Sequence, residues 1–187
     1  LGVSRTPVRA AITRLIHEGF AERSEGYSTR VADFPADELA EIFEVRRRLE
    51  CFAAERAAEL ATPDQITELG RLAAEMEALT PPDSDAAYAR LSDLNAAFHR
   101  IIAEAARSPR LMAILSLAVD VGVVSRTYLA YSEADLRRSA GHHRELVDAL
   151  AARSPLWAAS VMSSHILAAT LSARAAGRGT SPAGRRC

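Results

Sequence analysis

Apolar residues recur every three to four positions along most of the chain, which is the spacing of an α-helix with one buried face. The first such run follows Ser4, a residue suited to cap a helix, and ends near Gly19. The segments FAERS and STRV come next, separated by Glu25-Gly26-Tyr27, and they predict a short β-hairpin. From Asp33 onward the pattern predicts one helix after another.

Short proline-containing links divide this second part of the chain. Thr62-Pro63-Asp64-Gln65 has the pattern of a capping box, and Pro81-Pro82-Asp83 interrupts the helix that begins there. The helices predicted in this part are 35–60, 63–80, 85–106, 109–131, 134–152 and 155–176. Six helices with short links predict an all-α fold in which the helices form an antiparallel bundle. The composition of 177–187 predicts a flexible tail after the last helix.

The composition limits what kind of protein this is. A chain of 187 residues builds one medium domain, or a domain with a small module. The net charge of −1 excludes a general attraction to nucleic acid, so any such contact would have to be local. Cys51 and Cys187 form no metal or redox spacing and indicate a reducing compartment. Because the longest apolar stretch is too short to span a bilayer, we expect a cytoplasmic protein with no membrane contact.

The amino end of the first helix gathers polar and basic residues, namely Ser4, Arg5, Thr6 and Arg9. When such a helix enters the major groove of DNA, its first turn brings hydroxyl and guanidinium groups to phosphates and base edges. The alternative is a capped surface helix with ordinary exposed arginines.

Three histidines lie on apolar faces of three different predicted helices. His99 follows Asn95 by one turn beside an apolar stripe, and His143 and His165 lie on similar faces further along. A single histidine of this kind is usually a hydrogen-bonded core residue, and that alternative stays open. Three imidazoles directed toward one interior, with an amide oxygen beside them, predict a divalent metal site.

Several motifs, in the same order, resemble GntR-type bacterial transcription regulators. LGVSRTPVRAAITRLIHEGFAER resembles their recognition helix and the start of their wing. EVRRRLE, LNAAFHRIIAEAARSPRL, HHRELVDAL and SSHI resemble the helical effector domain of the FadR-like branch, the FCD domain. The resemblance implies a partial winged helix-turn-helix in 1–31 and an FCD domain of six to seven helices in 32–176. In the family a helix and the first helix-turn-helix element precede Gly2, so we expect an incomplete DNA-binding module.

The resemblance implies roles for individual residues. Ser4, Arg5, Thr6 and Arg9 would contact operator DNA, and Gly26 would lie at the tip of the wing. The partner helices that cover the recognition helix in the family do not precede it in this sequence. A metal- and acid-binding module that has lost DNA binding is therefore an alternative to a working regulator.

The resemblance also implies a set of metal ligands, Asn95, His99, His143 and His165. The metal would be Zn²⁺, with Ni²⁺ or Mn²⁺ as alternatives. The choice of His143 over His142 rests on alignment with the RELVDAL that follows. Asn95 stands where the family more commonly has Asp. Because an amide is neutral, we expect weaker metal retention and a stronger attraction for an anionic effector.

An arginine run in EVRRRLE supplies a candidate for effector binding. The apolar residues Ile42, Val45, Leu49 and Phe52 predict the buried face of this helix, and Arg46 borders it. All three arginines of the run could instead be solvated. The resemblance implies that Arg46 faces the effector pocket, where its planar fork suits a carboxylate.

The function expected from these features is a homodimeric transcription regulator, not an enzyme, which senses a small organic acid through a bound metal. A metal-dependent hydrolase is the other alternative, since three ligands and an open position also describe catalytic zinc. It is less favoured because HExxH is absent and neither Glu104 nor Glu145 stands out as a general base.

Overall fold

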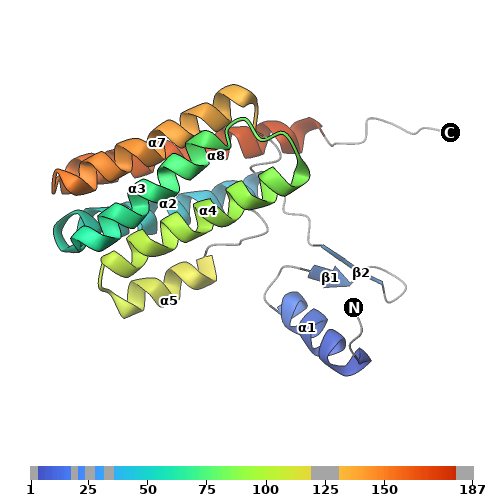
Figure 1. Cartoon of the computed structure of the whole chain (residues 1–187). Helices are drawn as coiled ribbons and strands as arrows, with labels where there is room; N and C mark the ends of the chain where they lie inside the picture. The colour runs from blue at the N-terminus through green and yellow to red at the C-terminus, as the bar shows by residue number, and fades with distance from the viewer. Residues whose placement is uncertain (1–3, 18–20, 24–27, 32–35, 119–130, 180–187) are drawn as a thin grey trace. The chain divides into compact units, whose positions relative to one another are not determined.

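The structure, a computed structural model, describes residues 4–17, 21–23, 28–31, 36–118 and 131–179 (Figure 1). Contacts between residues divide the chain into two units, Leu1–Pro35 and Ala36–Cys187. Each unit has its own architecture.

The smaller unit is a helix followed by a hairpin, as the sequence predicts. Helix α1 (Arg5–His17) precedes strands β1 (Ala21–Arg23) and β2 (Thr29–Val31), which pair in antiparallel fashion. Glu22 lies opposite Arg30 in the register, and Arg30 Nε donates a hydrogen bond to the Glu22 carboxylate at 2.7 Å. Such a cross-strand pair of opposite charges supports the register of a short ladder.

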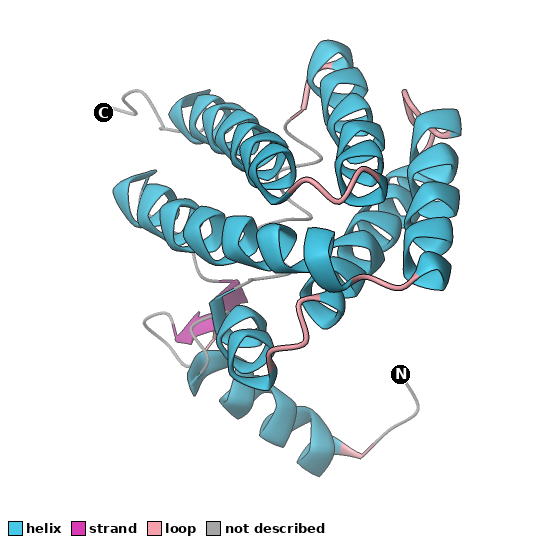
Figure 2. Ribbon diagram, turned by 90° about the vertical axis from the view of Figure 1, so that its left-hand side faces the viewer, coloured by secondary structure: helices cyan, strands magenta, loops and turns pink. Residues whose placement is uncertain are grey.

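The larger unit is a bundle of helices that run side by side (Figure 2). The described helices are α2 (Ala36–Leu60), α3 (Pro63–Ala78), α4 (Asp85–Ala105), α5 (Pro109–Ala118), α7 (Glu133–Ala151) and α8 (Pro155–Gly179). Helix α2 packs along α8, α7 packs against α3 and α8, and α4 lies against α2 and α3. The described helices confirm the all-α fold class, and none of them is both long and apolar enough to cross a membrane.

Capping residues determine several of the helix ends. The Thr62 hydroxyl accepts a hydrogen bond from the Gln65 amide, and the Gln65 side chain accepts one from the Thr62 amide, which confirms the predicted capping box. Ser132 and Asp135 make the same arrangement at the start of α7. Helix α5 is described to Ala118, and the predicted continuation of this helix to about residue 131 lies outside the described residues. Helix α8 ends at Gly179, beyond the predicted 176.

The core of the bundle combines large apolar side chains with many alanines. Phe43, Leu69 and Phe98 are among the largest side chains that are fully buried. On α2 the residues Ala53, Ala54, Ala57 and Ala58 are at most 1% exposed. Because alanine extends so little from the backbone, two helices can pack closely along such a surface.

The prediction for the buried face of α2 was wrong at Val45 and Phe52, whereas Ile42 and Leu49 are partly buried. Val45 and Phe52 are each 49% exposed, whereas Phe43, Arg46 and Glu50 are buried. The buried face is therefore rotated away from the one that the large apolar residues predicted. The physical reason is that Arg46 and Glu50 form an ion pair with each other, so that neither charge is buried alone.

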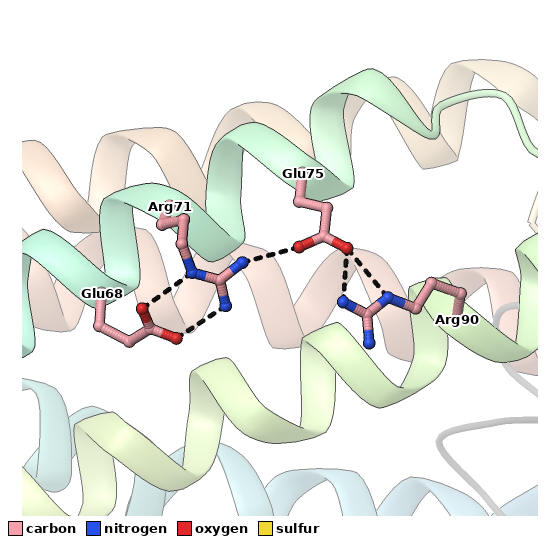
Figure 3. Close-up of polar contacts among 4 residues, drawn as sticks. All are labelled: Glu68, Arg71, Glu75 and Arg90. Atoms are coloured by element: carbon pink, nitrogen blue, oxygen red, sulfur yellow. Dashed lines mark hydrogen bonds and ion pairs between the residues drawn. The ribbon is translucent and has the colours of Figure 1, made fainter.

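An ion-pair network ties α3 to α4 at the surface (Figure 3). Arg71 pairs with Glu68 and Glu75 within α3, at 2.7 and 2.8 Å. Arg90 of α4 donates to the other oxygen of Glu75. These hydrogen bonds, first from Arg90 and then from Arg71, lower the pKa of Glu75 despite an opposing effect of desolvation.

Candidate functional site

Three histidines from three helices meet inside the bundle. His99 belongs to α4, His143 to α7 and His165 to α8, and one potential ligand atom from each lies within 4.8 Å of the others. The ring centroids are 5.7 Å apart for His99 and His143, 5.2 Å for His99 and His165, and 4.6 Å for His143 and His165. His143 is completely buried, and His165 is 5% exposed. The predicted convergence of the three imidazoles is thus found in the structure.

The apolar faces of the helices direct these rings inward. On α4 the buried residues Leu94, Phe98 and Ile102 occupy the face beside His99. Phe98 also packs edge-on against the His143 ring, with centroids 4.7 Å apart. Because side chains three and four residues apart share a helix face, burial of Phe98 and Ile102 also turns His99 toward the interior.

Asn95 joins the cluster from one turn before His99. Its side chain is 2% exposed, and its Oδ1 lies 3.1 Å from Nε2 of His143. An amide oxygen only accepts hydrogen bonds, so Nε2 of His143 carries the proton in this arrangement. Asn95 is thereby held in contact with a histidine that is 48 positions away in the sequence.

Glu50 is the member of the site that sequence reasoning missed. One of its carboxylate oxygens accepts a hydrogen bond from Arg46 Nε, and the other contacts Nδ1 of His99. Because a carboxylate only accepts, Nδ1 of His99 is the donor, and Nε2 is the ring nitrogen left to face a metal. The signal that could have identified Glu50 is its spacing of four from Arg46 in EVRRRLE, since a buried arginine requires a partner.

Each of the three rings has one buried nitrogen that lacks a hydrogen-bond partner among the described groups. These atoms are Nε2 of His99, Nδ1 of His143 and Nδ1 of His165. Buried polar atoms are nearly always paired in native proteins, so three unpaired atoms in one cluster indicate a missing partner. A divalent cation fits this donor set, because imidazole nitrogen is among the ligands that zinc prefers.

The charges in the cluster also suit a cation. Burial lowers the pKa of His143 and of His165 well below the ordinary 6.5, and the neighbouring histidines lower both further. Burial alone would raise the pKa of Glu50, but the charge of Arg46 and the hydrogen bonds from His99 and Arg46 lower it to about 2. The buried imidazoles are therefore neutral, which is the form that binds metal, and an ionised carboxylate lies beside them.

His143 enters this group, whereas His142 does not. His142 is only partly buried, and its ring centroid lies 5.8 Å from that of His165. Adjacent residues on a helix point about a quarter turn apart, and on α7 His143 lies deeper in the buried face than His142. The structure places His143 there, as the alignment with RELVDAL predicted.

A cavity of about 360 Å³ lies next to the cluster, between α2, α4 and α5. Its volume falls within the range of small-molecule sites. The described residues that line it are Arg46, Glu50, Ala53, Ser92, Asn95, Ala96, His99, Arg100, Ile102, Ala103, Met112, Leu115 and Ser116. His99 and Asn95 belong to both the histidine cluster and the cavity wall, so a molecule in the cavity could contact both.

Arg46 lies where the sequence predicts it, at the edge of the site. It is 5% exposed and lines the cavity, whereas Arg48 is exposed and Arg47 is partly buried. Its Nε is engaged by Glu50. Arg47 and Arg48 instead pair with Glu44 on the surface. The three arginines of one run therefore have different environments.

The candidate DNA contacts lie on the smaller unit. Ser4, Arg5, Thr6 and Arg9 are all exposed, at or just before the first turns of α1. Gly26, predicted at the wing tip, lies outside the described residues. Two apolar side chains of α1 are also exposed, Val8 at 37% and Leu15 at 42%.

Comparison with known sequences places the helical unit among regulators. Residues 41–168 match the sequence model of the FCD domain family. A protein of Paenarthrobacter nicotinovorans named "Probable D-xylose utilization operon transcriptional repressor" is 31% identical over 168 residues. That alignment covers 90% of this chain and 72% of the relative.

Several solved structures have a similar fold. E. coli McbR/YncC superposes with a TM-score of 0.76 at 25% identity, over 89% of this chain and 83% of that one. Lar, which controls the expression of the Listeria monocytogenes agr system and mediates virulence, superposes with a TM-score of 0.67 at 21% identity. That match covers 92% of this chain and 80% of Lar. A transcriptional regulator of the GntR family from Pseudomonas syringae superposes with a TM-score of 0.60 at 18% identity. That match covers 95% of this chain and 73% of the other chain. The latter two are similar in fold alone.

Proposed function

We propose that this chain controls transcription in response to a small organic acid. The chain belongs to the FCD-domain family of GntR-type transcription regulators, and the proposal starts from that membership. The family and its homologues are regulators rather than enzymes. The acid would bind inside the helical unit beside a divalent metal ion. The observation that carries the proposal is the meeting of His99, His143 and His165 at the wall of a cavity.

The residues that would hold the metal are Asn95, His99, His143 and His165. The metal would be Zn²⁺, with Ni²⁺ or Mn²⁺ as alternatives. When bound, the ion would supply a Lewis-acidic centre for a carboxylate oxygen. Glu50 supports this role by accepting a hydrogen bond from Nδ1 of His99, which would orient Nε2 toward the metal.

Arg46 would bind the effector carboxylate. Glu50 engages only the Nε of Arg46, so an effector would meet the terminal guanidinium nitrogens. Asn95 is neutral, and the three imidazoles are neutral as ligands. Glu50 is ionised, but its charge is already paired with Arg46, so the metal charge would stay largely uncompensated and would attract an anion.

Operator DNA would be contacted by Ser4, Arg5, Thr6 and Arg9, with Gly26 at the wing tip. A cytoplasmic homodimer would present two such modules, and effector binding would change their spacing. Val45 and Phe52 of α2, half exposed in the single chain, suit a contact between two copies. Acid and operator would then alter each other's affinity by the same factor.

A second candidate is a metal- and acid-binding module that does not bind DNA. The observation that favours it is the exposure of Val8 and Leu15 on α1. In a winged helix-turn-helix these side chains would be covered by neighbouring helices. The two candidates share the helical site and differ only in the function of the smaller unit.

Calorimetric titration of Zn²⁺ into chelator-treated protein tests the shared part of the proposal. We expect one ion to bind per chain. In a second titration, an organic acid should bind more tightly to the zinc-loaded protein than to the metal-free protein. Absence of any metal uptake would refute the site. Gel shift with operator DNA, with and without the acid, then separates the two candidates, because only the regulator gives a complex whose amount the acid changes.

A further inference from the structure

The cavity beside the histidine cluster changes in character along its length. Helices α2 and α4 run in the same direction, because Glu50 contacts His99 and, further along both helices, Arg56 donates to the carbonyl of Ala106. The polar wall residues come first on both helices, with Arg46 and Glu50 on one and Asn95 and His99 on the other. The cavity therefore has a polar end, which is the end shared with the histidines.

The other end of the cavity is apolar. Ala53 follows Glu50 on α2, and Ile102 and Ala103 follow His99 on α4. Helix α5 adds Met112 and Leu115 to the wall of the cavity. Aliphatic side chains from three helices thus face the space next to the polar end.

The polar side chains near this apolar end already have partners. The Ser116 hydroxyl donates to the carbonyl of Ala113 within α5, at 2.8 Å. Arg100 pairs with Glu104 at 2.6 Å, with its side chain 60% exposed. Ser116 is exposed as well, so the polar groups of both residues are in contact with water. A hydroxyl placed against Met112, Leu115 and Ile102 would lose water contacts that these apolar side chains do not replace.

We infer that the effector is a carboxylic acid with an aliphatic or aromatic body, and not a hydroxylated acid. This inference rests on the proposed function, since it takes the carboxylate to bind at the polar end near Arg46 and His99. The body then lies against Met112, Leu115 and Ile102. Each methylene transferred from water to that wall adds up to about fourfold in affinity.

The test uses the zinc-loaded full chain and three probes with the same six carbons. Hexanoate has both the acid and the apolar body, hexanamide lacks the charge, and 6-hydroxyhexanoate has a hydroxyl at the far end. Dissociation constants from calorimetry should be lowest for hexanoate, with 6-hydroxyhexanoate weaker by about tenfold. Hexanoate should also bind more weakly to the metal-free protein.

A pair of variants on α5 sharpens the test. Met112→Gln keeps the length of the side chain and places an amide in the apolar end, so it should reduce the preference for hexanoate over 6-hydroxyhexanoate by at least about threefold. Ile114→Gln makes a similar change outside the cavity, at a residue 50% exposed, and should leave the preference unchanged. Thermal melting confirms that both variants are folded.

The outcomes separate this inference from the proposed function. If 6-hydroxyhexanoate binds as tightly as hexanoate, the inference is overturned, and zinc-dependent binding of either acid would still support acid sensing. If hexanoate and hexanamide bind equally with or without zinc, while 6-hydroxyhexanoate binds more weakly, the apolar cavity is supported and acid sensing through the metal fails. If none of the three probes binds, the inference is also overturned.

Discussion

Helices α1 and α4 each carry polar residues within one or two turns, but the surroundings of these residues differ. On α4, Asn95 is buried and His99 is nearly so, and each contacts a residue from another helix. On α1, Arg5 and Arg9 are exposed. A buried polar group must have a partner within the fold, so its environment already indicates a site. An exposed group is satisfied by water, and its function depends on a partner outside the chain.

The largest expected effect concerns the buried region. His143→Ala removes one of the proposed ligands and should weaken Zn²⁺ binding by more than about 100-fold, since changes even in outer-shell partners cost 10- to 100-fold. His142→Ala is the matched control and should retain binding within about threefold, because His142 is outside the group of three. Affinity is measured by competition with a chromogenic chelator. Equal losses in the two variants would show that the wrong histidine had been assigned.

The next effect concerns the carboxylate behind His99. Glu50→Gln should weaken Zn²⁺ binding by about 10- to 100-fold, because His99 loses the charged acceptor that orients its ring. Glu44→Gln, on the same helix but paired with Arg47 and Arg48 at the surface, is the control and should leave affinity unchanged. Circular dichroism checks that Glu50→Gln folds despite the loss of the charge paired with Arg46. Unchanged zinc affinity in a folded Glu50→Gln protein would remove Glu50 from the site.

The exposed region should respond in the opposite way. The double variant Arg5→Ala with Arg9→Ala should leave zinc affinity and the melting temperature unchanged, because both side chains are solvated. Its affinity for operator DNA should fall by about tenfold or more, with a weaker dependence on salt. Gel shifts at two salt concentrations measure both quantities. A variant that retains the DNA affinity and salt dependence of the parent chain would argue that α1 does not contact DNA.

The smallest effect concerns the surface network of Figure 3. Arg90→Ala should lower the melting temperature by no more than about 2 °C at neutral pH, because exposed ion pairs contribute little. The folded state lowers the pKa of Glu75, so the carboxylate stabilises the fold above its unfolded pKa of about 4.5 and loses this contribution as the pH falls below that value. The difference between parent and variant should therefore vanish in acid. A difference that grows on acidification would contradict this account.

Much of the fold follows from local signals. The capping box at Thr62 and the helical spacing of apolar residues predicted the helices of the bundle, because these signals act within a few residues. The prediction that His99, His143 and His165 converge also succeeded, since each lies on an apolar face that must turn inward. The buried face of α2 could not be predicted in this way, because Val45 and Phe52 are as apolar as core residues and yet lie at the surface.

The sequence by itself determined which segments are helices, which faces of α4, α7 and α8 turn inward, and which histidines come together. Only the tertiary structure decided that Glu50 links Arg46 to His99, and that α2 buries this ion pair in preference to Phe52. Local patterns are limited to contacts within a few turns of one helix. The partner of a buried charge can lie on another helix, as His99 lies 49 positions from Glu50, and its place depends on how the helices pack.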